Sequence, residues 1–362
     1  MGRGSLLLAS VTTAVLCLGA CAAPDPGAAG PTTTTSTTTP AGPTTSSSSS
    51  TTSTSSTTSS SITTATQPAT TTTTTGTSGP WAQNGTLGSC HVFPADNAWN
   101  RDVSALPVDP NSGNYITSIG STTKLHADFG GGGVYGIPFI TVPGTQPLLP
   151  VAFNAYGDES DPGPYPIPLA APIEGDGVGD SHVLAVDRDH CKLYELYGAS
   201  AGPSGWTAAS GAVFDLTSNA LRPEGWTSAD AAGLPIFPGL VRYDEVKSGH
   251  IDHALRFTVS RSQAAYLHPA THFASSSTNA NLPPMGLRLR LSATFDLTPY
   301  HGDALVILQA LKTYGMIVAD NGSNWFISGA ADARWNDDDL NQLKLVPGGA
   351  FEVVDTGETL RH

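Results

Sequence analysis

Two ionisable residues stand directly before a run of four glycines, in the segment 125–139 with the sequence LHADFGGGGVYGIPF. His126 and Asp128 are two residues apart, so on an extended chain their side chains project to the same side. Such a pair can orient an imidazole as a base, bind a metal through nitrogen and oxygen, or simply cap a loop. Because glycine favours positive φ and close backbone approach, we predict a sharply turning loop at the edge of a β-sheet.

Two carboxylates occupy positions suited to acid–base chemistry. Glu195 shares a strand face with Leu193 and Tyr197, and burial there would raise its pKa toward that of a general acid. A partly exposed strand carboxylate is the alternative. Asp320 ends the apolar run MIVAD just before Asn-Gly-Ser, which suits either a site residue or a turn. Asp180 and His182 repeat the spacing of the first pair.

The other histidines are ambiguous. His253 falls on the same face as two apolar residues of its strand, which fits a core histidine or a site member at a strand end. His268 and His272 are spaced for zinc only on a suitable loop, and Pro269 argues against a helix. We therefore expect no metal and no cofactor. The candidate catalytic residues are His126, Asp128, Glu195, Asp320, His253 and His272.

Arginines and aromatic residues supply candidate binding groups. Arg288 and Arg290 lie on the polar face of an alternating strand, and Arg256 lies on the polar face of another. If the two strands were neighbours, these arginines would form a ridge for a carboxylate-bearing ligand; ordinary cross-strand ion pairs are the alternative. Tryptophans in polar loops favour either stacking on sugar rings or rim packing. The candidate substrate-binding residues are Tyr135, Arg256, Arg288 and Trp325.

Short strands and turns dominate the elements that must position these residues. Two helices are predicted, one at 303–314 and one that begins at Asn336. The side chain of Asn336 can cap the second helix, and the three aspartates that follow place negative charge in its first turn, where the helix dipole favours it. This pattern predicts a mainly β (α+β) single domain over 81–362, an antiparallel β-sandwich or jelly roll with one buried helix and one capping helix. The expected strands are 147–153, 182–187, 192–198, 240–246, 253–259, 286–295, 316–320, 325–328 and 351–355.

The N-terminal quarter indicates export. Residues 1–20 read as a signal peptide, and Leu18-Gly19-Ala20-Cys21 resembles the lipobox of bacterial lipoproteins, so we expect Cys21 to be lipidated and to anchor the chain to the outer face of the cell membrane. An ordinary secretory signal is the alternative. Residues 21–80 are rich in Thr and Ser, which predicts a disordered tether. In an exported protein Cys90 and Cys191 most simply form a disulfide.

Net charge excludes some partners. The chain carries a net charge of −14 without a run of basic residues, so a nucleic-acid partner is not expected, and membrane contact is expected only through the lipid anchor. Motifs for serine hydrolases, zinc proteases and phosphate loops are absent from the sequence. We expect a monomer.

Several segments carry a resemblance to an uncharacterised family of exported bacterial proteins. They include FPADNAWN at 93–100, HADFGGGGVYGIPF at 126–139 and ALKTYGMIVADNGSNWFISGA at 310–330. The resemblance implies one domain and no particular activity. From the residues, we expect an envelope-tethered enzyme acting on polysaccharide, either a glycoside hydrolase or a lyase. A non-catalytic carbohydrate- or wall-binding lipoprotein is the alternative, and an inert scaffold is a third.

Overall fold

The computed structural model describes residues 81–361, which fall in one compact unit. The predicted signal peptide, the lipidation site at Cys21 and the tether lie outside the described residues. Within residues 81–361 no helix is both long enough and apolar enough to cross a membrane.

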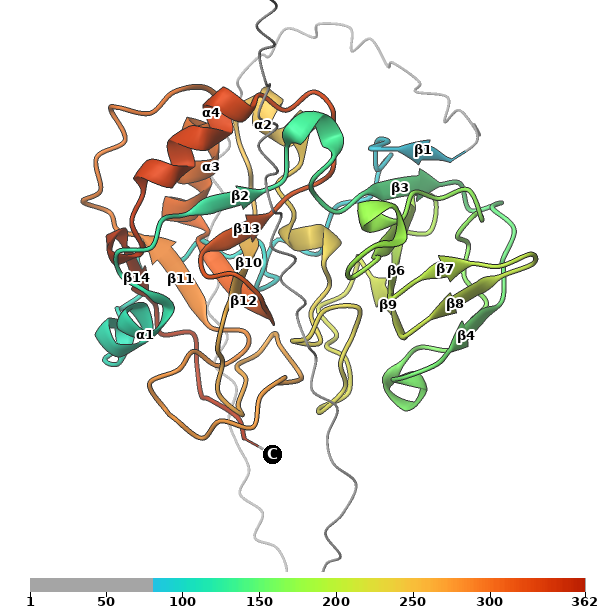
Figure 1. Cartoon of the computed structure of the whole chain (residues 1–362), viewed down its shortest axis with the longest axis horizontal. Helices are drawn as coiled ribbons and strands as arrows, with labels where there is room; N and C mark the ends of the chain where they lie inside the picture. Colours follow the sequence, from blue (N-terminus) through green and yellow to red (C-terminus); the bar gives the residue numbers. More distant parts are fainter. Residues whose placement is uncertain (1–80, 362) are drawn as a thin grey trace, which may run out of the picture. The chain divides into compact units, whose positions relative to one another are not determined.

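The larger of two main sheets has six strands in the order β14-β11-β12-β10-β13-β2. It occupies one side of the view in Figure 1, close to helices α3 and α4. Strand β2 lies at its edge, as the sequence predicted for the segment before the glycines. The strands are β2 His126–Asp128, β10 Leu255–Val259, β11 Arg288–Leu291, β12 Met316–Asn321, β13 Phe326–Ser328 and β14 Phe351–Val353.

A five-stranded sheet lies beside it, in the order β1-β3-β5-β6-β9, and a small three-stranded sheet of β4, β8 and β7 packs on its outer face through a second apolar cluster. The five-stranded sheet consists of β1 Ala82–Gln83, β3 Phe139–Val142, β5 Val183–Asp187, β6 Lys192–Tyr197 and β9 Ser210–Asp215. The small sheet consists of β4 Val151–Phe153, β7 Ser200–Ala201 and β8 Trp206–Ala208.

The predicted mainly β single domain with a few helices is confirmed. Both large sheets are mixed rather than purely antiparallel, because β10 and β12 pair in parallel and so do β3 and β5. These strands are buried on both faces, which is typical of parallel pairs covered by other chain segments. Short apolar runs do not distinguish the two pairing modes.

Four α-helices complete the described part of the chain: α1 Ser112–Ile119, α2 Tyr243–Ser248, α3 Gly302–Thr313 and α4 Asp337–Asn341. Helix α3 is the predicted buried helix, and Asn336 caps α4 by accepting from the N–H groups of Asp338 and Asp339. The strand predicted at 240–246 is wrong, because its second half forms α2. Asp244 and Glu245 occupy the first turn of α2, where the helix dipole favours negative charge.

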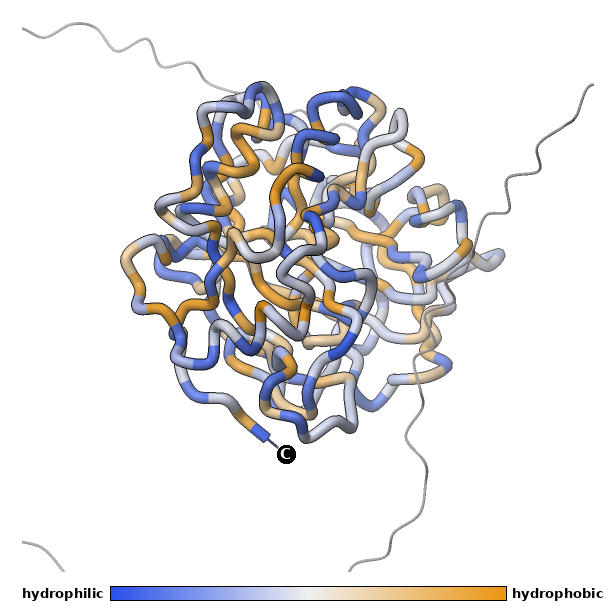
Figure 2. Tube along the Cα trace, turned by 60° about the vertical axis from the view of Figure 1, so that its left-hand side comes forward, coloured by the Kyte–Doolittle hydropathy of each residue, from blue (hydrophilic) through white to orange (hydrophobic). Residues whose placement is uncertain are grey.

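A single irregular segment, residues 229–239, fills the space between the two large sheets. It bonds to both, since the N–H of Ala232 donates to Ala319 O on β12 at 3.1 Å and the N–H of Phe237 donates to Glu195 on β6 at 2.9 Å. Apolar stretches of the chain concentrate in the interior and hydrophilic ones in the outer loops (Figure 2). The sheets therefore share one core through this segment.

The predicted disulfide is confirmed. Cys90 and Cys191 are bonded, with their Cα atoms 5.3 Å apart. The bond ties the N-terminal segment to the β5–β6 hairpin.

Candidate active site

Strand register places polar side chains in two adjacent rows on one face of the six-stranded sheet. In the first row, Asp128 on β2 pairs with Ser328 on β13. The β10–β13 register, Phe257 with Ile327, places Arg256 opposite Ser328. Directly paired residues lie on the same face, so Asp128, Ser328 and Arg256 form a line across three neighbouring strands.

The second row lies one step further along the strands. His126 pairs with Phe326, and Phe326 pairs with Thr258. Thr258 in turn pairs with Asp320 on β12. The second row therefore runs Asp320, Thr258, Phe326, His126, and all four residues are half-buried.

A register shift explains why Asp320 belongs to this face. Phe257 pairs with Val318, but the next residue, Thr258, pairs with Asp320, which leaves Ala319 as an extra residue in β12. Without the shift, Asp320 would share the core face of Val318. β-Bulges commonly redirect side chains beside functional sites. Here the bulge turns a carboxylate out of the core and toward Arg256, with Asp320 Oδ2 3.9 Å from Arg256 Nη2.

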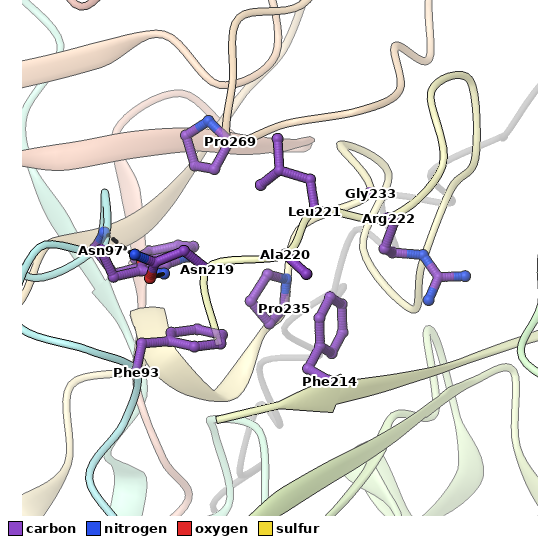
Figure 3. Close-up of a pocket in the computed structure, with 11 residues that line it drawn as sticks. Phe93, Asn97, Phe214, Asn219, Ala220, Leu221, Arg222, Gly233, Pro235 and Pro269 are labelled. Atoms are coloured by element: carbon purple, nitrogen blue, oxygen red, sulfur yellow. Dashed lines mark hydrogen bonds between the residues drawn. The ribbon is translucent and has the colours of Figure 1, made fainter. Parts of the chain in front are cut away.

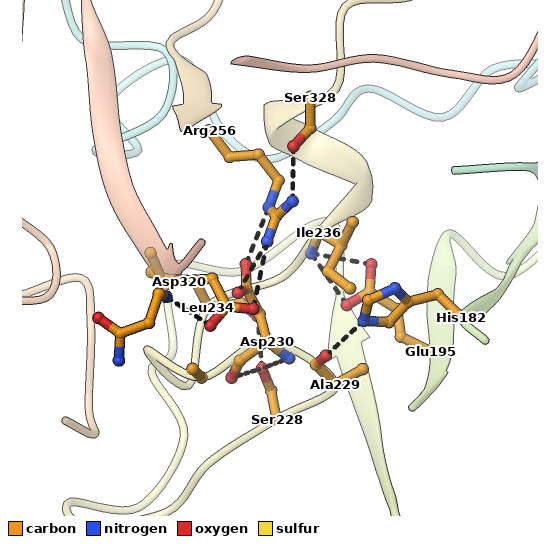
Figure 4. A network of polar contacts seen from close by, with 12 residues as sticks. His182, Glu195, Ser228, Ala229, Asp230, Leu234, Ile236, Arg256, Asp320 and Ser328 are labelled. Atoms are coloured by element: carbon orange, nitrogen blue, oxygen red, sulfur yellow. Dashed lines mark hydrogen bonds and ion pairs between the residues drawn. The ribbon is translucent and has the colours of Figure 1, made fainter. Parts of the chain in front are cut away.

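Arg256 of the first row forms a buried ion pair with Asp230, and we call this pair the floor of the site. Arg256 donates from Nε and Nη2 to the two carboxylate oxygens of Asp230, at 3.1 and 3.0 Å, and from Nη1 to Ser328 Oγ at 2.6 Å. Asp230 is fully buried and Arg256 nearly so. Figure 4 shows this fork at the centre of the network, with Asp320 on one side and His182 and Glu195 on the other. Burial raises the pKa of Asp230, and the positive charge of Arg256 opposes that shift.

A second buried pair comes from the five-stranded sheet. His182 stands just before β5, and its two ring nitrogens face only acceptors: Glu174 Oε2 at 2.5 Å from Nδ1 and Ala229 O at 3.0 Å from Nε2. Burial opposes ionisation of Glu174, but the charge and hydrogen bonds of His182 lower its pKa, so Glu174 accepts as a carboxylate. Both ring nitrogens then donate, as in the imidazolium. Burial disfavours the positive charge on His182, but the negative charge and hydrogen bond of Glu174 have a larger effect and raise the pKa of His182 to about 9. The pair closes the loop 174–182 onto the 229–239 segment.

Three carboxylates reach solvent above these pairs: Asp128, Asp180 and Asp320, which we call the acidic rim. Asp128 and Asp180 are exposed and make no side-chain hydrogen bond within residues 81–361, and the Asp320 side chain is 25% exposed. Although accessible, Asp128 is crowded by protein, and this partial desolvation with the charges of Glu174 and Asp180 raises its pKa. Burial and the charge of Asp230 raise the pKa of Asp320 to about 7, with a further contribution from Asp180.

Glu195 is completely buried, so it is not placed to touch a substrate, contrary to the general-acid role considered from the sequence. Its carboxyl accepts from the N–H groups of Ile236 and Phe237 at 2.9–3.0 Å. Burial raises the pKa of Glu195 to about 7, as the sequence argument anticipated for a buried carboxyl. Its position indicates that it holds the 229–239 segment against β6.

The predicted histidines separate into different environments. His126 shares the sheet face of Asp128, whereas His253 is buried against Glu245 and Arg242 in another part of the molecule. The Nδ1 of His272 lies 2.7 Å from Ala231 O, next to Asp230 in the chain. Only His126 therefore belongs to the two rows.

Two of the predicted binding residues are corrected by burial. Trp325 is fully buried and its Nε1 donates to Gly120 O at 2.9 Å, so it is a core residue. Arg288 is buried and donates to the carbonyls of Ala98, Arg101 and Tyr314. The arginine ridge does not form, because β12 separates β10 from β11.

The remaining predicted binding residues have different exposures. Tyr135 is 61% exposed at the tip of the glycine loop, while Arg256 is a buried floor residue. Of the other loop tryptophans, Trp206 and Trp335 are buried and Trp226 is half-buried. An exposed tryptophan platform is therefore not available in the described residues.

Two hollows of the described domain lie away from the rows. One, of about 30 Å³, is bordered by residues such as Phe93, Phe214 and Pro235 (Figure 3), and it has room for roughly one water molecule. Another, of about 170 Å³, is lined by charged residues such as Arg242, Glu245 and Arg334 that are already paired with other side chains. Within residues 81–361 no three His, Cys, Asp or Glu side chains are grouped to hold a metal ion.

Sequence reasoning missed Asp230 and Glu174, which anchor the site. Asp230 lies in a loop of small residues and Glu174 in a glycine-rich one, so neither stands on a periodic element. The available signal was indirect: a strand arginine whose neighbours are buried requires an acidic partner from elsewhere in the chain.

The imidazolium at His182 makes a pH-dependent contribution to stability. Its folded-state pKa of about 9 lies above the unfolded value of 6.5, so the contribution is complete below about pH 6.5 and is lost as pH rises through 9. The shift corresponds to about 3 kcal/mol at its maximum. We expect urea denaturation to show His182→Gln less stable than wild type by about that amount at pH 6, with the gap narrowing by pH 10. A pH-independent gap would contradict the charged state.

Comparison with family models, curated proteins and solved structures gave no match. The site must therefore be interpreted from its own residues.

Proposed function

We propose that this protein hydrolyses glycosidic bonds of an extracellular or cell-wall polysaccharide, with the acidic rim as its acid–base machinery. The observation that carries the proposal is the bulge in β12, which directs the half-buried Asp320 onto the sheet face beside Arg256 and Asp230. Two further carboxylates have no side-chain partners in the described domain. Asp128 lies on the same face, and Asp180 is near enough for its charge to contribute to the raised pKa of both Asp128 and Asp320.

Each rim residue has a role that follows from its surroundings. Asp320 is the proton donor, because its raised pKa keeps a large fraction protonated near neutral pH. Asp180 is the base that activates water, since it is exposed, and its charge acts on both Asp320 and Asp128. Asp128 accepts hydrogen bonds from substrate hydroxyl groups. Two carboxyl groups, one acid and one base, are the usual machinery of glycoside hydrolysis.

Charge favours hydrolysis over elimination by a lyase. Elimination acts on uronic acids, and the ionised carboxylates of the rim would repel a substrate carboxylate. The nearby cations, Arg256 and His182, are buried in pairs with Asp230 and Glu174 and are not free to neutralise such a group. A neutral, hydroxyl-rich glycan fits the rim better, because its hydroxyl groups can donate to the carboxylates.

The predicted leader and Cys21 would place this activity at the outer face of the membrane, where wall and matrix glycans are found. A non-catalytic glycan-binding lipoprotein is the competing reading. The burial of Trp325, Trp206 and Trp335 speaks against a tryptophan binding platform.

The test is incubation of the full chain with peptidoglycan, chitin, cellulose, xylan and α-glucan, with release of reducing ends as the readout. We expect wild type to cleave at least one polysaccharide and Asp320→Asn to cleave none at a comparable rate. Asp176→Asn is the matched control, since Asp176 is an exposed residue of the same loop as Asp180 and already has positive φ, which asparagine tolerates. Binding without products from wild type would overturn the hydrolase proposal for these substrates.

A further inference from the structure

The second row of the sheet ends in a pair of stacked rings. The rings of His126 and Phe326 have centroids 4.1 Å apart and planes inclined by 27°. Both residues are half-buried, and the stack covers the facing side of each ring, so contact with a ligand is left to the outer sides and edges of the rings. The ring of His126 has no hydrogen-bond partner among residues 81–361, which leaves stacking as its observed interaction.

Register fixes the distance of this pair from the acid. Asp320, Thr258, Phe326 and His126 occupy four consecutive strands in one row, β12, β10, β13 and β2. Three strand spacings of about 4.8 Å place His126 about 14 Å from Asp320 along the row. This span exceeds one sugar ring, so a group bound at the ring pair belongs to a different unit of a polymer from the one protonated by Asp320.

The chemistry of the pair suits a sugar ring. Partial burial, together with the positive charge of Lys344, lowers the pKa of His126, which favours the neutral imidazole. A neutral imidazole beside a phenyl ring presents an apolar surface with one polar edge. Asp128 lies two residues along β2 on the same face, where its carboxylate can accept from the hydroxyl groups of a sugar held on the rings.

We propose that His126 and Phe326 form a sugar-stacking subsite, so that the substrate is an extended neutral glycan lying across the strands along the second row. The inference rests on the proposed hydrolysis for the position of the cleaved bond, but stacking itself does not require cleavage. His126 is then a binding residue rather than a base.

Binding to an inactive variant tests the subsite. Asp320→Asn is titrated calorimetrically with cello- and chito-oligosaccharides of increasing length and examined by affinity electrophoresis in the panel polysaccharides. We expect affinity to rise with oligosaccharide length, and adding Phe326→Ala or His126→Ala to weaken binding of the longer ligands about tenfold, roughly the effect of losing one aromatic contact. Addition of His126→Phe should retain binding, because it keeps the stack.

The control is Leu148→Ala on the same background, because Leu148 is 59% exposed and belongs to neither row. Thermal melting verifies that each variant folds. Equal binding by Asp320→Asn with and without Phe326→Ala would overturn the subsite, and so would absence of binding to every polysaccharide. Cleavage by wild type with no effect of Phe326→Ala would reject the subsite alone. Length-dependent binding through Phe326 without cleavage by wild type would reject the hydrolase and support the subsite.

Discussion

Asp320→Asn is expected to lower kcat/KM on the cleaved glycan by about 10²- to 10⁴-fold, the usual contribution of a positioned proton donor. Asparagine keeps the shape of the side chain but cannot protonate the departing oxygen. The loss should be much smaller with an aryl glycoside of the same sugar, because a leaving group of low pKa departs without protonation. This contrast between substrates distinguishes a proton donor from a residue that only holds the site together.

The controls for this prediction come from the same site. Asp176→Asn removes a negative charge from the 174–182 loop and should retain nearly full activity. Melting temperatures should show that Asp320→Asn is folded; because burial raises the pKa of Asp320, removing its charge should not destabilise the domain. Near-wild-type cleavage of the natural glycan by Asp320→Asn would contradict the assignment.

Asp230→Ala is expected to destabilise the domain by about 3–5 kcal/mol, the usual consequence of leaving a buried charge without its partner. Arg256 is almost fully buried, and two of its three donating nitrogens bond to Asp230. Ser328 is neutral, and Asp320, whose Oδ2 lies 3.9 Å from Nη2, makes no hydrogen bond that could replace those of Asp230. Urea denaturation at pH 7 gives the free energy of unfolding.

The matched comparison for Asp230→Ala is the double variant Asp230→Ala/Arg256→Met, which removes both charges. We expect the double variant to be more stable than Asp230→Ala alone, because no charge is left uncompensated. If the double variant lost as much stability as Asp230→Ala, or more, the two residues would not act as a pair. Both variants should also lose activity, since Asp230 and Arg256 surround Asp320.

Local pattern was sufficient where a residue's neighbours in sequence decide its position. The spacing of His126 and Asp128 correctly placed both on one face of an edge strand, because alternation is intrinsic to extended backbone. The cap at Asn336 and the burial of α3 followed from the same kind of local rule. The disulfide between Cys90 and Cys191 followed from cysteine count.

Residue positions that depend on long-range pairing could not be predicted from the local sequence pattern. Asp320 lies on the sheet face of Arg256 and Asp128 only because of the bulge at Ala319, which depends on how β12 pairs with β10. Asp230 reaches Arg256 because the 229–239 segment passes between the sheets, and the sequence of this segment does not predict that position. Trp325 has polar neighbours in the chain, yet it packs between Phe257 and Phe351. In each case a partner distant in sequence decided the outcome.

The most direct test of Asp320 as the proton donor is the pH dependence of kcat/KM on the glycan that wild type cleaves. Asp320 must be protonated to act, so activity should fall as pH rises through about 7, the pKa that burial and the charge of Asp230 give this carboxyl. Asp176→Asn should keep this fall, and the residual activity of Asp320→Asn should show none near pH 7. A fall near pH 7 that persists unchanged in Asp320→Asn would contradict the account.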